Sequence, residues 1–410
     1  MSDPVLVMLP GRASRTDSVS ARSIAAASLA AAIDRRVGAI YLEGTERRDP
    51  GEIDAVRVRA ASTGRSLAYT VPRIIRPAIG DLRHAADART AARGLARAPI
   101  PRVAAVVQFH RRFHREGLAL AARNGIPSVV RVEALEVREE GAWGVRRPAY
   151  GSLIERLGER TILRDADLTA AVSPELDRLL GDLGVPAARR LVLSNGVDLE
   201  RFAPGPPDAR LLRLGLAGRF VVGWVGGFRP HHGLQQIEPL ARRLREDAPD
   251  VVLCLVGTGP LEAEVAQAAR RFPEQVVLAG PAAPAEVPMW LRTFDACVSF
   301  AEPGPYHYDP MKVLESLACG RPLVAARAGD LASRLRDGTD ALVVSPGDPR
   351  STAAAIVRLA RDRELRTTLA TGARLAAVRE GSWDDRASAL LDAIHDIRPR
   401  AEPRAVAGRA

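Results

Sequence analysis

The stretch YDPMKVLESLACGRPLVAA occupies residues 308–326, and its pattern of a helix followed by a strand sets the expectation for the fold. Asp309 and Pro310 predict a helix start, because a carboxylate can cap the first turn and proline suits the first helical position. The run RPLVAA (321–326) then reads as a short buried strand. A helix that leads directly into such a strand is typical of an α/β sheet.

The same alternation extends outward from this stretch and occurs in two sets along the chain. Helical patterns separate most of the strands in the first set, at 19–35, 114–124, 152–163 and 174–183. This arrangement predicts two α/β domains, each built on a parallel sheet. The predicted strands are 4–9, 37–42, 56–60, 103–107, 127–132, 168–172 and 190–194 in the first set, and 220–225, 251–256, 276–280, 294–300, 321–326 and 341–345 in the second.

The segment FAPGPPDARLLRLGLAG (202–218) is rich in proline and glycine and separates the two sets. Ligands of paired α/β domains bind at the carboxyl ends of the strands, in the cleft where the domains face each other. The expected organisation is a first domain over 1–200, a linker over 201–218, a second domain over 219–380, a C-terminal helix over 381–398 that packs back on the first domain, and a disordered tail over 399–410.

Composition excludes several classes of protein. The 410 residues suffice for two or three domains of about 150 residues each. The three cysteines, two of them in apolar strands, and an opening without a basic and apolar leader favour a cytoplasmic protein. A phosphate-binding GxxxxGK[ST] loop is absent, and the nearest match to a dinucleotide fingerprint, Gly257–Thr258–Gly259, lacks its third glycine. P-loop and NAD-dependent chemistry are therefore not expected.

The net charge of +10 is concentrated in residues 51–150, which hold 18 arginines and nine acidic residues. We favour an arginine-rich coding bias as the cause, and the alternative is a surface that meets an anionic substrate or membrane. The arginines are not interleaved with aromatic residues and no nucleic-acid motif occurs, so no nucleic-acid partner is expected. Asp165 and Asp167 precede a predicted strand, a poor position for a metal-binding Asp-x-Asp pair, and we expect no metal.

Lys312 is the one lysine among 59 basic residues. It falls in the first turn of the helix predicted after Asp309, with Glu315 three residues further on the same face. A surface ion pair is one interpretation, but a cation at a helix N-terminus opposes the helix dipole. The lysine is better explained by an anion such as a diphosphate above the helix N-terminus.

With these residues in view, the chain resembles the retaining family-four glycosyltransferases of the GT-B fold. The resemblance rests on KVLESLACGRPLVA, VLSNGVDLERFAPG, VVGWVGGFRPHHGL, LCLVGTGP and LAGPAAPAEVPMWLRTFDA in this order, and it is dense over about 170–385. It implies two facing Rossmann-like domains with helices on both faces of parallel sheets. The first domain would bind the acceptor, and the second would bind a nucleoside diphosphate sugar.

The resemblance also implies roles for residues of the second domain. Arg229 would grip the diphosphate beside Gly227, and His232 stands where the family usually has a second basic residue, a lysine. As an imidazole with an ordinary pKa near 6.5, His232 would make this grip sensitive to pH. Lys312 would complete the diphosphate site, and Glu315 would hold the ribose.

Two further donor-binding residues and His110 of the first domain follow from the same resemblance. Ala282 lies in the matched LAGPAAP segment, and His307 replaces the glutamate that usually reads the donor sugar. In the first domain, His110 follows a buried strand and would lie near the transferred sugar, although a satisfied structural histidine is the alternative. Independently of the resemblance, Gly11 follows the first predicted strand and would let backbone N–H groups approach a phosphate, although a tight turn would need glycine equally. Residues 132–148 hold four glutamates and fit either an acceptor-binding loop or a solvated one.

The expected function is transfer of a sugar from a nucleoside diphosphate sugar to a small-molecule or glycan acceptor, with retention at the anomeric carbon. Arg229, Lys312 and His110 are the candidate catalytic residues, and neither a cofactor nor a metal is expected. Three alternatives stay open: a peripheral membrane enzyme with a lipid-linked acceptor, a sugar-nucleotide epimerase, and a non-catalytic sugar-nucleotide binder. The sequence identifies neither the base, nor the sugar, nor the acceptor.

Overall fold

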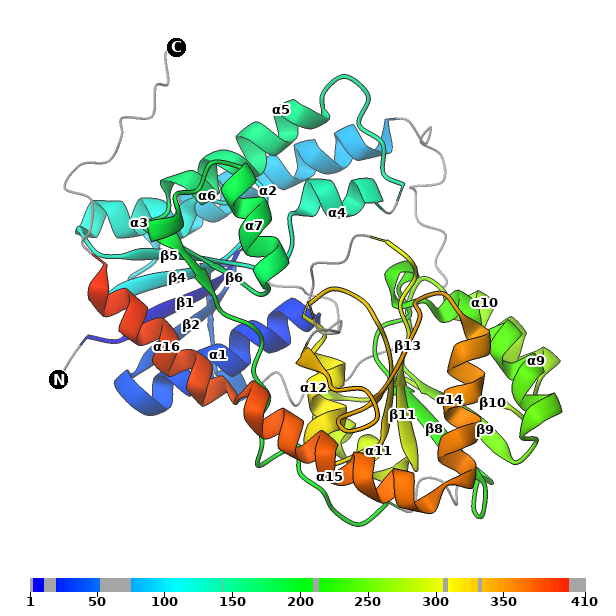
Figure 1. Cartoon of the computed structure of the whole chain (residues 1–410). Coiled ribbons are helices and arrows are strands. Elements are labelled where there is room, and N and C mark those ends of the chain that lie inside the picture. The colour runs from blue at the N-terminus through cyan, green and yellow to red at the C-terminus, as the bar shows by residue number, and fades with distance from the viewer. Residues whose placement is uncertain are drawn as a thin grey trace.

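The computed structural model of the chain describes residues 3–10, 20–51, 75–142, 144–208, 214–304, 309–330 and 334–397 (Figure 1). Two expected site residues, Gly11 and His307, lie outside the described residues. The expected strand at 56–60 and the expected disordered tail also lie outside them. Within the described residues the chain forms two α/β domains, each around its own sheet.

The first domain contains a seven-stranded sheet with the order β3-β2-β1-β4-β5-β6-β7. All neighbouring strands are parallel except β3, which pairs antiparallel with β2. The strands are β1 (Val5–Leu9), β2 (Ala39–Glu43), β3 (Glu46–Arg48), β4 (Ala105–Phe109), β5 (Ser128–Val132), β6 (Leu168–Ala171) and β7 (Arg190–Val192). The helices are α1 (Ala21–Val37), α2 (Arg76–Arg97), α3 (Glu116–Asn124), α4 (Glu136–Ala142), α5 (Gly151–Glu155), α6 (Thr161–Asp165) and α7 (Pro174–Asp182), with a π-helical turn between α5 and α6.

The second domain contains a six-stranded parallel sheet with the order β10-β9-β8-β11-β12-β13. Its strands are β8 (Phe220–Val225), β9 (Val251–Val256), β10 (Val276–Gly280), β11 (Ala296–Ser299), β12 (Leu323–Ala326) and β13 (Leu342–Val344). Its helices are α9 (Ile237–Asp247), α10 (Glu262–Arg271), α11 (Val287–Thr293), α12 (Met311–Ala318), α14 (Pro349–Arg361) and α15 (Arg363–Glu380), and α16 (Trp383–Asp396) follows.

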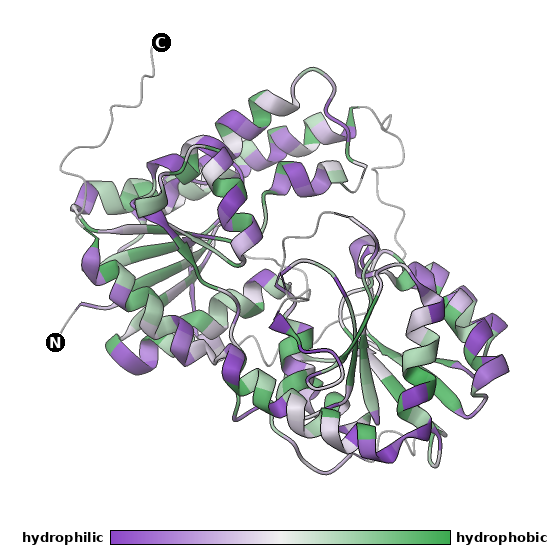
Figure 2. Cartoon of the chain, viewed as in Figure 1, coloured by the Kyte–Doolittle hydropathy of each residue, from purple (hydrophilic) through white to green (hydrophobic). Residues whose placement is uncertain are grey.

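The predicted fold class is confirmed. Every strand predicted within the described residues forms, with bounds within two residues of the prediction. The reason is visible in Figure 2, where the strands of both sheets carry mostly hydrophobic residues while the helices have two faces. The short strand β3 was not predicted, because its sequence Glu-Arg-Arg has no apolar residue and it pairs only at the edge of the sheet.

Two segments join the domains and lie side by side. The first follows β7, and the second leads from α15 into α16, which packs on α1. Trp383, Ala387 and Leu390 of α16 belong to the core beside the first sheet. Gly196 touches the second segment so closely that an added Cβ would lie 2.5 Å from the Trp383 nitrogen. The junction between the domains is therefore tightly packed.

Among the described residues, no helix has the length and apolar character needed to cross a membrane.

Candidate functional site

The floor of the candidate site consists of the loops after β8 and β9. The Gly226 and Phe228 nitrogens donate to the carbonyls of Val256 and Thr258, each over 2.9 Å. Gly257 has a φ of +150°, and a Cβ there would lie only 1.9 Å from the Gly226 oxygen. Only glycine fits such a contact, so the two loops pack rigidly against each other at the carboxyl ends of their strands. The surface formed by residues 226–232 and 257–259 is called the ledge below.

Gly227, Arg229 and His232 follow along this ledge. The Gly227 backbone and the Arg229 side chain are exposed, and Arg229 forms no ion pair with the described carboxylates. The Nδ1 atom of His232 donates to the Gly227 carbonyl over 2.6 Å, and the ring stands edge-on to Trp224. Burial, and then the charge of Lys312, lower the pKa of His232 to about 2. The expectation of an ordinary pKa near 6.5 is therefore wrong, and the ring is neutral at physiological pH.

Lys312 reaches this ledge from the first turn of α12, as predicted. Its ammonium lies 4.5 Å from the centre of the Trp224 ring, a cation–π contact. It also lies against Gly226, since a Cβ built on that glycine would be 3.4 Å from Nζ. Burial lowers the pKa of Lys312 to about 7, and Glu315 opposes this shift. The lysine is thus held in a site that favours the arrival of an anion.

The predicted cap of this helix is wrong. Pro310 is the N-cap residue of α12, and no side chain caps the helix. The carboxylate of Asp309 instead accepts hydrogen bonds from Asn195 and Arg334. These partners are distant in sequence, so local spacing could not reveal them.

Glu315 lies one turn beyond Lys312, and both line a narrow cavity together with Ser299 and Ser316. Burial raises the pKa of Glu315 to about 7, against the opposing charges of Arg201 and Lys312. The Arg201 guanidinium also donates to the carbonyl of Pro284. Arg201 and Trp224 are therefore site residues that sequence reasoning missed, because no local pattern indicates which helix they face.

The loop that follows β10 completes this part of the site. Ala282 lies in it, half-buried against the core that contains Trp290 and Leu314. The structure thus brings Gly227, Arg229, His232, Lys312 and Glu315 together around the carboxyl end of β8, and it places Ala282 in the loop that contacts Arg201.

His110 lies in the first domain and has its own partner. The side chain is buried, at 2% exposure, and Nε2 lies 3.3 Å from the Glu159 carboxylate. Its Nδ1 has no hydrogen-bond partner among the described residues. His110 follows β4 as predicted, but its polar contact is with Glu159 rather than with the residues around Lys312.

Three of the four glutamates of residues 132–148 form ion pairs with arginines. Glu133 and Glu136 lie 3.7 and 2.9 Å from the guanidinium of Arg22, at the N-terminus of α1. Burial would raise the pKa of Glu136, but the charge of Arg22 lowers it to about 2. Glu140 pairs with Arg112 in the same way. The interpretation as a solvated acidic loop is therefore wrong.

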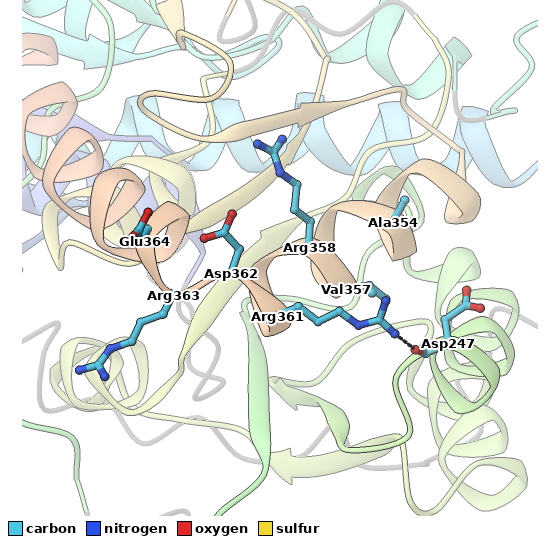
Figure 3. Close-up of a pocket in the computed structure, with 8 residues that line it drawn as sticks. All are labelled: Asp247, Ala354, Val357, Arg358, Arg361, Asp362, Arg363 and Glu364. Atoms are coloured by element: carbon cyan, nitrogen blue, oxygen red, sulfur yellow. Dashed lines mark hydrogen bonds between the residues drawn. The ribbon is translucent and has the colours of Figure 1, made fainter.

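The Asp165–Asp167 pair and a further hollow of the structure lie outside this site. Asp165 pairs with Arg115, and Asp167 accepts from the backbone and side chain of Ser128. No three metal-binding side chains converge anywhere in the described parts of the chain. A wide, open hollow of about 690 Å³ lies where α14 meets α15, and there Arg361 donates to the Asp247 carbonyl (Figure 3). The charged residues that line this hollow have both signs and are largely exposed, whereas the polar groups around Lys312 are buried. We therefore do not take the hollow as the functional site.

Two Rossmann-like domains with a polar site at the facing strand ends define the GT-B class of fold. Solved structures share it: HepE of Anabaena in complex with UDP and glucose aligns over 96% of this chain and all of its own, with a TM-score of 0.68 at 18% identity. Sucrose-phosphate synthase of Thermosynechococcus elongatus aligns over 95% of this chain and 98% of its own, with a TM-score of 0.68 at 17% identity.

Sequence comparison identifies the family. The model "Glycosyltransferase Family 4" matches residues 43–201, and "Glycosyl transferases group 1" matches residues 219–362. The D-inositol 3-phosphate glycosyltransferase of Frankia alni is 32% identical over 304 residues, which cover 69% of this chain and 72% of the relative. The protein of the same name from Geodermatophilus obscurus is 32% identical over 270 residues, 62% of this chain but only 58% of the relative. The chain belongs to the family-four glycosyltransferases.

Proposed function

We propose that this protein is a retaining, metal-independent glycosyltransferase that moves a sugar from a nucleoside diphosphate sugar to a small-molecule or glycan acceptor. The observation that carries the proposal is the arrangement of Lys312 and Glu315, one helical turn apart on α12, beside the loop that holds Arg229. Similar structures of HepE hold UDP, UDP with glucose, or UDP-glucose, which makes a UDP-sugar the first donor to test.

The proposed chemistry depends on stabilising the leaving group. As the bond to the anomeric carbon breaks, negative charge grows on the diphosphate. Lys312, Arg229 and the N-terminus of α12 would stabilise that charge more strongly in the transition state than in the bound donor. Arrival of the anion would raise the pKa of Lys312 from about 7 and keep its ammonium charged. Glu315 would orient the donor by accepting hydrogen bonds from ribose hydroxyls. Retention is carried over from the family resemblance.

The acceptor side of the proposal rests on the first domain. The relatives are named for D-inositol 3-phosphate, a small phosphorylated polyol. Arg111 stands after β4, where its guanidinium approaches the Pro10 carbonyl and His84 at 3.3 and 3.5 Å, and it forms no ion pair with a described carboxylate. An arginine of this kind suits an anionic group on the acceptor.

A thermal-shift screen of UDP-, GDP-, ADP- and dTDP-sugars tests the donor, because a ligand that binds only the folded state raises its melting temperature. The expected result is stabilisation by one nucleotide and transfer from its sugar to a polyol phosphate. Absence of stabilisation by any nucleotide would contradict the proposal. Stabilisation without transfer would favour the non-catalytic binder, and conversion of the donor without an acceptor would favour the epimerase. Transfer only to a lipid-linked acceptor on anionic vesicles would favour the membrane enzyme.

A further inference from the structure

Asp309 stands three residues before Lys312, and its side chain belongs to a buried network between the domains. The carboxylate is 2% exposed. One oxygen accepts from the Asn195 backbone nitrogen over 2.6 Å, and the other accepts from the Arg334 guanidinium over 2.6 Å. The Asp309 carbonyl also accepts from the Asn195 amide over 2.8 Å. Three hydrogen bonds thus fix the residue that precedes Pro310 and α12.

The other side of Asn195 is fixed to the first domain. Its amide oxygen accepts from the guanidinium of Arg131, which extends from β5 and also donates to the Leu193 carbonyl over 2.9 Å. Arg131 is fully buried, with its guanidinium 5.7 and 5.9 Å from the rings of Phe109 and Trp383. A side chain enclosed in this way cannot follow a displaced partner, so Asn195 moves with the first domain.

Arg334 connects Asp309 to the second joining segment. Its Nε lies 3.1 Å from the carboxylate of Glu380, the last residue of α15. Asp309 therefore contacts the joining segment after β7 directly, through Asn195, and the segment before α16 through Arg334. Removing its carboxylate would leave a buried backbone N–H of Asn195 without an acceptor and a largely buried guanidinium with one partner fewer, both of which are costly.

We propose that Asp309 is a positioning residue: it ties the start of α12 to the two joining segments and thereby sets Lys312 against Trp224 in the arrangement in which the domains are packed together. The inference rests on the proposed function for the meaning of the Lys312 site, but the geometry itself does not depend on it. If the domains move relative to each other, the contacts of Asp309 would displace the start of α12 and therefore Lys312. In the other direction, a donor that holds Lys312 in place would favour the packed arrangement of the domains through the same contacts.

The single lysine of the chain makes the inference measurable without activity. Protein produced with lysine labelled at ¹³Cε gives one side-chain NMR signal, and the Trp224 ring beneath the ammonium shifts that signal from the position of a free lysine. In Asp309→Ala we expect the signal to move toward the free-lysine position and the Kd for UDP to rise about tenfold. Asp309→Asn keeps one acceptor for Asn195 but loses the charge beside Arg334, so it should show a smaller change in the same direction.

Asp384→Asn is the matched control, because it also breaks a carboxylate–arginine pair next to a joining segment, the exposed one between Asp384 and Arg35. It should change neither the signal nor the Kd. An unmoved lysine signal and an unchanged Kd for UDP in folded Asp309→Ala would overturn the inference. Should that variant fail to fold, the same two readings on Asp309→Asn decide. If the wild type binds no nucleotide, the proposed function fails, while the lysine signal still tests the role of Asp309.

Discussion

Replacing Lys312 should separate catalysis from folding more clearly than any other change in the chain. The variants are Lys312→Met, which keeps an unbranched side chain one atom shorter and removes its charge, and Lys312→Arg, which keeps the charge but widens the group. The ammonium lies between the Trp224 ring and Gly226, with only 3.4 Å between Nζ and the position of a Cβ on that glycine. A planar guanidinium does not fit this space without displacing the ledge.

The magnitude follows from the proposed role. One preorganised charge at a leaving group contributes about 2–4 kcal/mol to transition-state stabilisation, so kcat/KM of Lys312→Met should fall roughly 30- to 1000-fold. Lys312→Arg should also be impaired. The folded state of Lys312→Met should be more stable than that of the wild type at pH 7. The reason is that burial lowers the pKa of Lys312 from 10.5 to about 7. The unfolded chain then binds the proton more strongly, so the lysine destabilises the fold below about pH 10, and the cost is greatest at and below about pH 7.

The assay is steady-state kinetics with the best donor, together with melting temperatures at pH 7 and pH 9. The wild type should gain stability between these values relative to Lys312→Met, in which the lysine contribution is absent. Turnover near the wild-type level in both variants would refute the assignment of Lys312 to the donor diphosphate.

Three further predictions concern metal independence, His232 and His110. Turnover should survive chelation by EDTA, and loss of activity that manganese or magnesium restores would contradict metal independence. His232→Ala removes the hydrogen bond that holds Gly227, so the Kd for UDP should rise about five- to tenfold, an effect of roughly 1–1.5 kcal/mol; an unchanged Kd would show that the imidazole does not order the ledge. His110→Ala should lower kcat at least tenfold and leave the Kd for UDP within twofold, because His110 and its partner Glu159 both lie in the first domain, outside the nucleotide site; a large loss of UDP affinity would place His110 in the nucleotide site instead.

The fold could be predicted because its strands are short runs of apolar residues, and such runs indicate burial. FVVGWV and VVLCLV are two examples. The first-turn position of Lys312 and its proximity to Glu315 could also be predicted, since both follow from spacing within one helix. The ionisation of His232 could not, because it depends on burial by the ledge and on a lysine eighty residues later in the chain. The roles of Gly11 and His307 stay predictions.

Asp309 illustrates the limit of local reasoning. An aspartate before proline and an apolar helix is a good cap in isolation. In the structure the carboxylate instead accepts hydrogen bonds from the buried Asn195 backbone nitrogen and from the Arg334 guanidinium. These donors, distant in sequence, take the place of a backbone N–H in the first turn of α12. Trp224 was missed for a related reason: a tryptophan in a buried strand gives no sign in sequence that a lysine ammonium will lie on its ring.

Burial leaves Lys312 only partly protonated near pH 7, and we expect an anionic donor to complete its protonation on binding. The most direct measurement is the pH titration of the single ¹³Cε-lysine NMR signal, first in the free protein and then with saturating UDP. Among the groups near this ammonium, Glu315 raises its pKa, and the imidazoles of His231 and His232 are both neutral near pH 7. Arg229 acts on these two imidazoles from the same loop. We expect a midpoint near pH 7 in the free protein and a clearly higher one with UDP bound. A midpoint near 10.5 that UDP leaves unchanged would show that Lys312 is neither buried in this way nor in contact with the donor.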